Sequence, residues 1–597
     1  MLTVTENPKW VTYENRLHNL QKVGYTLLYR TWLSEQLIAT RKELRMMLNR
    51  ESGILLHFTS LYSKYGIGDL GQHAYEFVDF LKEGGQRLWQ ILPINPTGFK
   101  DSPYQSFSTF AGNPLLICPD GLLKLGLLTP EDLMDIPNFP EDKVDYGPVI
   151  TYKDTLLRTA YERFCVARDQ PLRNTYDDYI AKNQEWLADY GLFMALKSYF
   201  IELRRDPENR GDYKAFVKKN QAFLTDEQLA DYYYGAVWQS WPEEISKRSP
   251  IALEVWTEKL HVEIGYHQFL QFIFTKQYEA LKTYANENGV RIIGDIPIFV
   301  ALDSSDCWAN PDLFLLDDDG NPTGVAGVPP DYFSEDGQLW GNPLYDWKAM
   351  KAIGYQWWIA RIESALAFCD IIRIDHFRGF VGYWQVPYGA TTARKGAWMP
   401  GPGHDLFVAI KGQLGDLPII AEDLGVITPE VEALRDDFNL PGMKVIQFGF
   451  DAGHHNEHLP HNFDKSHAVV YTGTHDNDTT IGWYENSSPE IKDQFRRYLN
   501  VSGEDAAWDM IRLAFLSVPR MAIVPIQDVL RLDESGRMNT PGTSNGNWQY
   551  RLTPHALTGK LAEQLKYLSL LSDRNIKIYI ENDVPVVNGE SVLEKQS

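Results

Sequence analysis

The chain has 597 residues, 44% of them hydrophobic and 23% charged, and is long enough for a large core with added subdomains. Its 80 acidic and 57 basic residues give a formal charge of −23, which argues against a nucleic-acid partner, because that would need clustered Lys and Arg. The sequence contains neither an apolar run long enough to span a membrane nor the features of a signal peptide. With four widely spaced cysteines that read as reduced thiols, we expect a cytoplasmic protein without a membrane partner.

Residues 1–50 are polar and aromatic, and we interpret them as an N-terminal extension with a helical pattern from Tyr25 to Leu48. Strand-like runs follow at Ile54–Phe58 and Arg87–Ile94. Between them, Gln72–Lys82 has a helical pattern and is followed by Gly84-Gly85, as is typical of a helix C-terminus. This order predicts a βαβ unit, and we assign residues 51–120 to the first part of a barrel.

Residues 121–288 are charged and aromatic with few β-branched runs, which predicts a mostly helical insertion. Six further strand-like runs follow it: Arg291–Ile296, Asp370–Asp375, Pro418–Glu422, Met443–Phe448, Ala468–Thr474 and Met521–Pro525. Eight short apolar strands separated by helix-length segments favour an α/β fold of the (β/α)8 TIM-barrel type over a doubly wound sheet. The remainder of the barrel is expected in residues 289–555.

Two segments stand apart from this pattern. Residues 317–342 hold five Gly and three Pro, which predicts a long loop after the third strand, and such loops are usually functional or disordered. Residues 556–597 form a C-terminal tail in which Lys577–Ile580 and Val584–Val587 indicate an edge hairpin.

Four carboxylates, Asp295, Asp375, Glu422 and Asp476, each follow an apolar run that is predicted to be a buried strand. Burying an unpaired charge is costly, so a carboxylate at such a place is expected to face water or a substrate. Because parallel barrel strands bring their carboxyl ends together, the four acids predict a shared catalytic mouth.

The neighbours of two of these acids suggest different roles. Arg373 and Asp375 lie two apart in a strand and therefore face the same side, and the cation is expected to lower the pKa of the acid, as a nucleophile requires. The apolar run before Glu422 is expected to raise its pKa, as a general acid requires. A structural ion pair and a solvated acidic turn are the alternatives. The pair, in a chain with 13% aromatic residues, points to glycoside cleavage.

Other chemistries lack their motifs. The chain has no GxxxxGK[ST], and its GxGxxG at Gly66–Gly71 does not directly follow the strand-like run Ile54–Phe58, which argues against P-loop and dinucleotide functions. It also lacks HExxH, and we interpret His454, His455, His458 and His461 as a polar loop rather than a metal site. We therefore expect neither a metal nor an organic cofactor.

Several long motifs occur in order between about Ser52 and Leu552. They include YGIGDLG from Tyr65, DSPYQS from Asp101, RIDHFRG from Arg373, AEDLG from Ala421, GTHDND from Gly473 and RMNTPGTSNGNW from Arg537. With these motifs the chain resembles the 4-alpha-glucanotransferases of glycoside hydrolase family 77, also called amylomaltases or disproportionating enzymes.

The resemblance implies a barrel related to α-amylases that transfers α-1,4-glucan segments, with retention, between maltooligosaccharides or starch- and glycogen-like chains. By motif match, Asp375 would be the nucleophile, Glu422 the general acid and then base, and Asp476 the acid that holds the sugar hydroxyls. Arg373 and His475 would support them. The family positions that line the glucan would be Asp295, His376, Ser102, Tyr104, Trp340, Asn342 and Asp451, with Tyr332 and Phe333 on a loop over the cleft.

Two other functions remain open at this point. An α-1,4-glucan hydrolase would use the same site with water as the acceptor, and a glucan-binding protein would keep the aromatic residues without catalysis. The oligomeric state is not predicted.

Overall fold

A computed structural model describes residues 50–597 except 168–169, 207–212, 331–333, 452–454, 544, 576–577, 582–583, 588–589 and 592–597. The chain divides into two compact units, residues 51–572 and residues 1–50 with 573–597, which are described separately. The helix predicted at Tyr25–Leu48 lies outside the described residues.

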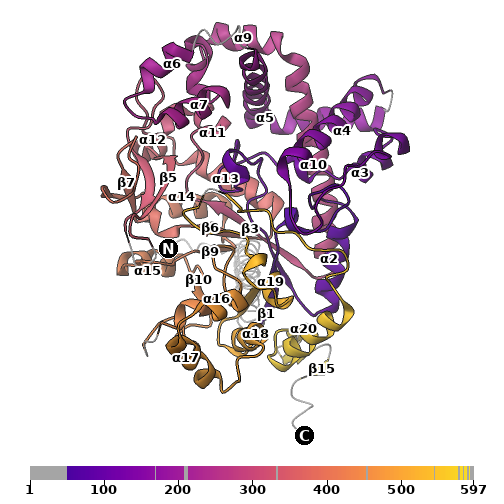
Figure 1. Ribbon diagram of the computed structural model, residues 1–597, viewed down its shortest axis with the longest axis vertical. Coiled ribbons are helices and arrows are strands. Elements are labelled where there is room, and N and C mark those ends of the chain that lie inside the picture. Colours follow the sequence, from indigo (N-terminus) through magenta and orange to yellow (C-terminus); the bar gives the residue numbers. More distant parts are fainter. Residues whose placement is uncertain are drawn as a thin grey trace, which may run out of the picture. The chain divides into compact units, whose positions relative to one another are not determined.

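The first unit is built on eight parallel strands (Figure 1). They are β1 (Glu51–Leu55), β2 (Leu88–Gln90), β3 (Arg291–Pro297), β6 (Ile371–Asp375), β9 (Ile419–Ala421), β10 (Gly442–Val445), β11 (Ala468–Tyr471) and β12 (Met521–Pro525). Their order in the sheet is β10-β11-β12-β1-β2-β3-β6-β9. Between the terminal strands β9 and β10, Ala421 N donates to Pro441 O at 2.9 Å, and Met443 N donates to the Asp423 carboxylate at 2.7 Å. The predicted (β/α)8 barrel is confirmed.

Alternating side chains divide each strand between the barrel interior and the surrounding helices, as a period of two requires. Leu88, Ile293 and Ile371 belong to one interior cluster, whereas Ile292 and Ile372 pack with the outer core. Ile293 of β3 pairs with Ile371 of β6. Two residues further along the same strands, the paired interior residues are the polar Asp295 and Arg373. The barrel therefore has an apolar interior at one end and charged groups towards its carboxyl end.

Helices connect most of the strands. They are α2 (Gln72–Glu83), α10 (His261–Glu287), α13 (Gln356–Phe368), α14 (His404–Leu414), α15 (Pro429–Asp437), α16 (Thr480–Asn486), α17 (Pro489–Leu499), α18 (Ala506–Leu516), α19 (Ile526–Val529) and α20 (Gly559–Leu571), with the short α11 (Ser305–Ala309) and α12 (Trp347–Ala352) after β3. Helix α2 buries Phe77, Val78 and Leu81 and ends at Gly84, close to the position that its sequence predicts.

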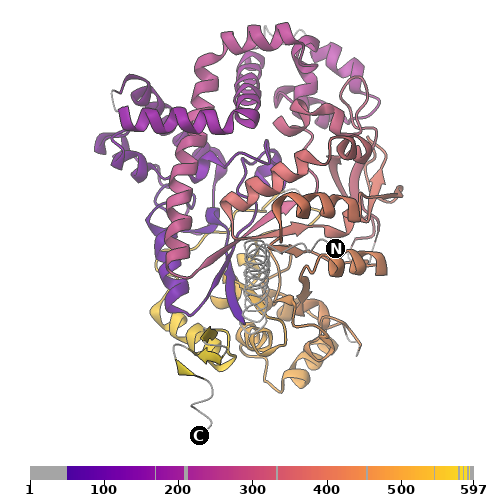
Figure 2. The ribbon, with the colours of Figure 1, turned by 180° about the vertical axis from the view of Figure 1, so that it is seen from behind.

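Between β2 and β3 the chain is mostly helical. This segment contains α3 (Pro119–Lys124), α4 (Tyr146–Val166), α5 (Gln170–Arg205), α6 (Tyr213–Asn220), α7 (Asp226–Tyr234), α8 (Glu243–Ser246) and α9 (Pro250–Lys259), followed by α10. Helix α5 packs along α10. Figures 1 and 2 show α5 to α9 at the end of this unit opposite α16 to α18.

The segment predicted as a long loop contains regular structure instead. Strands β4 (Val325–Val328) and β5 (Gln338–Pro343) join β7 (Gly382–Val386) and β8 (Ala397–Pro400) in an antiparallel sheet of order β5-β4-β7-β8. The loop prediction was wrong there because Gly and Pro interrupt the sequence of both strands: β4 reads VAGV before Pro329-Pro330, and β5 reads QLWGNP. Neither strand therefore shows an uninterrupted apolar run.

The C-terminal part of the second unit contains β13 (Ile578–Glu581), β14 (Val584–Val587) and β15 (Glu590–Ser591). The first two pair antiparallel as the predicted hairpin, but they form a separate three-stranded sheet with β15. Among the described helices of the whole chain, none is long and apolar enough to cross a membrane.

Candidate active site

A cleft of about 640 Å³ opens at the carboxyl end of the barrel. Asp375, His475 and Asp476 line it together with residues from four other segments. These residues come from Lys100 to Gln105, Pro297 to Phe299, Gln338 to Asn342, and Asn539 to Gln549. Two of the predicted acids, Asp375 and Asp476, thus meet aromatic and amide side chains in a space large enough for several sugar rings, whereas Glu422 and Asp295 are buried and do not line it.

Asp375 is the last residue of β6 and is held by a cation. The Arg373 guanidinium forms ion pairs with Asp375 at 2.9 Å and with Asp295 at 2.6 Å. Asp295 also accepts a hydrogen bond from the Tyr104 hydroxyl at 2.7 Å. Asp295 lies inside β3 rather than at its end, so the prediction of a strand-end position was wrong for this acid. Arg373 thereby joins the acids of two neighbouring strands.

The net pKa of Asp375 differs from the expectation drawn from the sequence. Burial raises the pKa of this carboxyl above its ordinary value, and the charge of Arg373 opposes that effect without reversing it. The cation acts in the predicted direction, but sequence alone did not reveal how deeply the acid would lie. The expectation of a lowered pKa was therefore wrong.

Glu422 directly follows β9 and is held by backbone groups. Its carboxylate accepts hydrogen bonds from His376 N at 2.6 Å and from Leu424 N at 3.0 Å. The residue is 8% exposed. Burial, with the nearby negative charge of Asp375, raises the pKa of Glu422 to about 8, so the carboxyl is largely protonated at neutral pH. The raised pKa agrees with the expectation from its apolar approach.

The register of β6 and β9 brings these two acids together. Arg373 pairs with Ile420 and Ile374 with Ala421, so Asp375 and Glu422 occupy the next position along the two strands. Neighbouring strands lie about 4.8 Å apart, and residues directly opposite each other face the same side. The two carboxyl groups therefore share one side of the barrel mouth.

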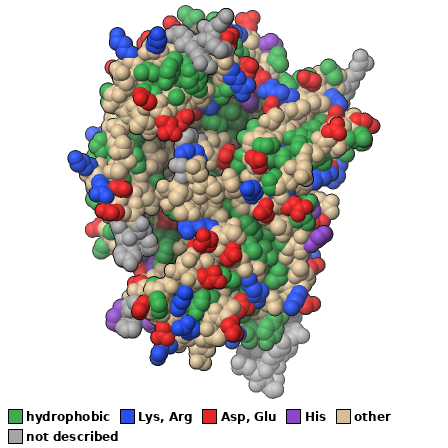
Figure 3. All heavy atoms as spheres, in the orientation of Figure 1, with side chains coloured by type: hydrophobic (Ala, Val, Ile, Leu, Met, Phe, Trp, Pro, Cys, Tyr) green, Lys and Arg blue, Asp and Glu red, His purple; other side chains and the backbone are tan. Residues whose placement is uncertain are grey.

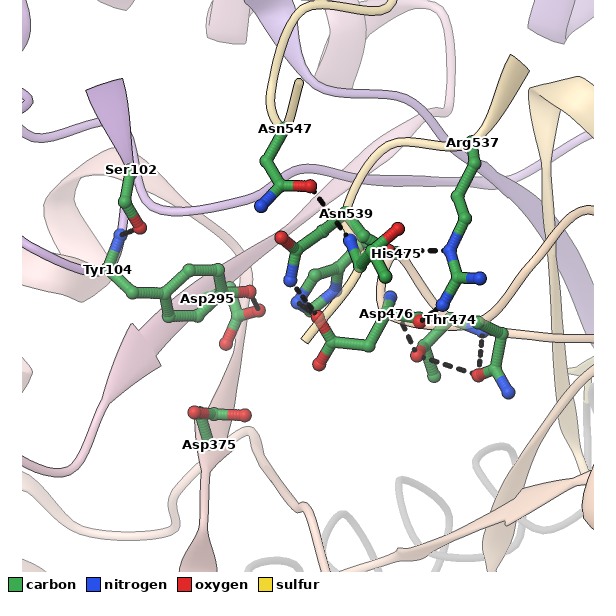
Figure 4. A network of polar contacts seen from close by, with 12 residues as sticks. Ser102, Tyr104, Asp295, Asp375, Thr474, His475, Asp476, Arg537, Asn539 and Asn547 are labelled. Carbon is green, nitrogen blue, oxygen red and sulfur yellow. Dashed lines mark hydrogen bonds and ion pairs between the residues drawn. The ribbon is translucent and has the colours of Figure 1, made fainter. Parts of the chain in front are cut away.

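Asp476 lies in the loop after β11 and not at the strand end, which is at Tyr471. Its side chain is 46% exposed, and one oxygen accepts a hydrogen bond from Asn539 Nδ2 at 2.6 Å. His475 Nε2 lies 3.4 Å from the same oxygen. Arg537 donates to the backbone carbonyl of Asp476 at 2.9 Å (Figure 4). Asp476 is thus fixed through one oxygen while the side chain stays open to the cleft.

Most of the other predicted residues surround this centre. Tyr104 stacks on His475 with ring centroids 5.2 Å apart, and its backbone N donates to Ser102 Oγ at 3.3 Å. Trp340 meets the His376 ring edge to face at 4.7 Å. Asn342 donates to Val300 O at 2.9 Å and accepts from Gln105 at 3.2 Å.

One described residue of the prediction is not brought to this centre. Asp451 is exposed, receives a hydrogen bond from Asn456 at 2.8 Å, and does not line the cleft. Tyr332 and Phe333 lie outside the described residues.

Sequence reasoning missed several residues of the cleft. Arg537 and Asn539 hold Asp476 (Figure 4), and Asn547 and Trp548 line the same wall. Trp548 also packs near the Tyr104 ring, with centroids 5.7 Å apart. All four belong to the motif from Arg537 to Trp548, so the signal was present, but a loop motif does not reveal which of its residues face a site.

A barrel with a pair of carboxylates at its carboxyl end and an aromatic cleft beside them defines the class of barrel enzymes that cleave glycosidic bonds. A family model described as 4-alpha-glucanotransferase matches residues 56–558. The chain belongs to the 4-alpha-glucanotransferase family.

Individual relatives agree with this assignment. A 4-alpha-glucanotransferase from Synechocystis sp. is 47% identical over 534 residues, covering 89% of this chain and 99% of that protein. One from Thermus thermophilus is 45% identical, covering 89% and 100%. The solved amylomaltase from Streptococcus agalactiae in complex with acarbose superposes with a TM-score of 0.80 at 38% identity, covering 88% of this chain and 99% of that one.

Proposed function

We propose that this enzyme transfers α-1,4-glucan segments between maltooligosaccharides or starch- and glycogen-like chains by a retaining double displacement. The observation that carries the mechanism is the adjacency of Asp375 and Glu422 on paired strands. A retaining pair needs its carboxyl groups about 5 to 5.5 Å apart, which neighbouring strands can supply, whereas an inverting pair leaves room for a water.

In the first step Asp375 attacks the anomeric carbon and Glu422 gives its proton to the departing glycosidic oxygen. The ion pair with Arg373 favours the ionised form of Asp375 against the effect of burial. Because the pKa of Glu422 is raised, its carboxyl can supply a proton at neutral pH. The raised pKa of Glu422 suits a proton donor, and the ion pair with Arg373 is the contact that favours an anionic nucleophile at Asp375.

In the second step Glu422, now anionic, takes a proton from the attacking hydroxyl, and the ester bond to Asp375 breaks. A sugar hydroxyl as attacker gives transfer, and water gives hydrolysis. Asp476, open to the cleft but fixed by Asn539, is placed to hold sugar hydroxyls of the bound ring. The wall from Asn539 to Gln549 narrows the space around the acceptor and would favour a sugar over water.

The remaining assignments are parts of the same proposal. Arg373, His475, Asp295, His376, Ser102, Tyr104, Trp340 and Asn342 serve glucan binding, with Asp451, Tyr332 and Phe333 assigned by motif match. Residues 51–120 and 289–555 form the catalytic barrel, residues 121–288 a helical insertion, and the protein works in the cytoplasm. The steps above use only carboxylates of the chain, so we expect activity to persist after chelator treatment.

Product analysis with maltotriose tests transfer against hydrolysis. Transfer yields free glucose together with a ladder of longer oligomers, because each cleaved segment is passed to another chain. A hydrolase with the same site yields only shorter sugars, and that product pattern would refute the proposal. A glucan-binding protein would yield no products.

A further inference from the structure

We infer that Asp528 is a positioning residue for Asp476, because its buried carboxylate fixes both ends of the loop Gly473–Thr479. The inference rests on the proposed role of Asp476 and adds the group that sets its orientation. Asp528 itself does not line the cleft.

Asp528 lies in the short helix α19, directly after β12, and is 1% exposed. One of its oxygens accepts hydrogen bonds from Thr472 Oγ1 at 2.6 Å and Thr480 Oγ1 at 2.8 Å. The other accepts from Thr480 N at 2.7 Å. Thr472 is the first residue after β11, and Thr480 is the first residue of α16. One carboxylate thus joins the residue before the loop to the residue after it.

The loop between these two threonines is bonded to itself. Thr474 donates through its backbone N at 2.9 Å and its hydroxyl at 3.0 Å to Asn477 Oδ1. Asp476 N donates to Thr474 Oγ1 at 3.3 Å (Figure 4). These bonds make the turn a unit whose parts move together. A shift at either end is therefore passed to Asp476.

A small cavity lies beneath the loop. It has a volume of about 30 Å³, and Thr474, His475 and Asn477 of the loop line it. Because this space is large enough for a water, these side chains are not held by tight packing, and the orientation of the loop depends on the groups that hold its two ends.

The hydrogen bonds to Asp528 all run from donors to its carboxylate. Among the described residues no Lys, Arg or His forms an ion pair with it, and its two oxygens accept instead from Thr472 Oγ1, Thr480 Oγ1 and Thr480 N. An amide has one acceptor oxygen in place of two. With that oxygen on Thr480 N, the NH2 group would meet the two threonine hydroxyls, which would have to turn and accept. Asp528→Asn would therefore reverse the bonds to both hydroxyls while changing the side-chain volume very little.

The first test measures kcat and KM for maltotriose in Asp528→Asn. Because a small misplacement of a group at the reacting centre costs large factors in rate, we expect kcat to fall about tenfold or more while KM stays within about threefold. Thr480→Ser, which keeps the hydroxyl, should retain nearly full kcat, and Thr480→Val should lose part of it. Unchanged kcat in folded Asp528→Asn, or equal losses in the two Thr480 variants, would overturn the inference.

A control separates positioning from general stability. Asp69 is also a buried carboxylate, accepting from Ser63 Oγ at 3.1 Å and Gly71 N at 2.9 Å, and it does not line the cleft. We expect Asp69→Asn to lower the melting temperature but to keep the wild-type kcat. If Asp69→Asn lowers kcat as much as Asp528→Asn does at matched stability, the effect of Asp528 is structural and the inference fails.

A double-mutant cycle shows whether the effect runs through Asp476. The rates of Asp476→Asn, Asp528→Asn and the double variant are measured with α-maltosyl fluoride, whose leaving group needs no protonation. If Asp528 acts through Asp476, it should cause little further loss once Asp476 has been replaced. If the rate loss of the double variant equals the product of the two single losses, the inference is overturned. The wild-type enzyme would still transfer glucan in that case, so this outcome differs from a failure of the proposed function.

Discussion

The two carboxylates on β6 and β9 are held by different kinds of group. Asp375 is paired with the side-chain cation of Arg373, whereas Glu422 receives two backbone N–H groups and lies beside the charge of Asp375. A cation favours the ionised acid, and burial near another anion favours the protonated one. Burial raises the pKa of both acids, but a cation opposes the shift at Asp375, whereas a nearby anion adds to it at Glu422. The comparison teaches that the immediate partners of two neighbouring acids can distinguish their protonation although both are buried.

The largest effect is expected from removing the nucleophile. Asp375→Asn cannot form the glycosyl ester, so kcat for maltotriose disproportionation should fall by about four orders of magnitude. Affinity for maltooligosaccharides, measured by calorimetry, should stay nearly unchanged because the cleft keeps its other contacts. Near-normal turnover in this variant would contradict the difference in role between the two acids.

The next largest effect concerns the cation that distinguishes them. Arg373→Lys keeps the charge but loses the forked geometry that reaches Asp375 and Asp295 together. We expect kcat to fall by about a hundredfold, because the nucleophile is then poorly oriented and less ionised. Steady-state kinetics over a range of pH measures the change. An unaltered kcat and pH profile would mean that Arg373 serves the fold alone.

The pKa of Glu422 predicts opposite consequences for activity and stability. Its folded-state pKa of about 8 lies above the ordinary value of 4.5, so folding favours its protonated form. The stability that this gives is fully present below about pH 4.5 and is lost as the pH rises to about 8. Glu422→Gln, which cannot ionise, should therefore be more stable than the wild type at pH 8, by roughly 1 to 3 kcal/mol. Below pH 4.5 this advantage should be absent, and the variant should be the less stable protein, because its amide leaves one of the two backbone N–H groups without an acceptor.

Denaturant unfolding at pH 8 and below pH 4.5 measures the difference in stability between Glu422→Gln and the wild type. Steady-state kinetics of the wild type test the consequence for activity. The kcat/KM of the wild type should decline as the pH rises through about 8, because the general acid loses its proton. A decline that begins near pH 5 would show that Glu422 is not buried enough to act as proposed.

The smallest effect is expected one contact further from the nucleophile. Tyr104→Phe removes the hydrogen bond to Asp295, the second acid held by Arg373, and keeps the ring that stacks on His475. We expect a loss of about 1 to 2 kcal/mol in stability, because a buried acceptor loses a partner, and a kcat change of only a few-fold. A loss comparable to that of Arg373→Lys would place Tyr104 in direct contact with the reaction.

Sequence reasoning predicted the barrel and the main acids because both leave local patterns. Arg373 and Asp375 share a side through the period of a strand, and the apolar run before Glu422 indicates its burial. The net pKa of Asp375 could not be predicted, since it depends on the depth of the site. Asn539 bonds Asp476 from 63 positions away and carries no charge, so it left no signal of its own.

Asp528 was missed for a related reason. It follows its strand by three residues, inside a helical turn, and therefore does not resemble the strand-end acids. The antiparallel sheet of β4, β5, β7 and β8 was missed because Gly and Pro interrupt β4 and β5 and because β8 is exposed throughout. These strands leave no uninterrupted apolar run in the sequence.

Acidic and basic side chains are interspersed over the face shown in Figure 3, so the formal charge of −23 does not form a single field there. This distribution suits a neutral substrate, whose approach gains nothing from electrostatic steering. Salt is therefore expected to change the association rate little.

The junction between β9 and β10 has a consequence for how the barrel opens. There a backbone bond from Ala421 to Pro441 and a bond from Met443 to the Asp423 side chain join the two ends of the sheet. Amide groups protected by a side chain exchange through smaller local openings than those in a continuous ladder. In native-state hydrogen exchange, the Met443 amide should therefore exchange before the strand amides of β1 and β12. Strand β10, which lies beside β9 and Glu422, would then open more readily than those two strands.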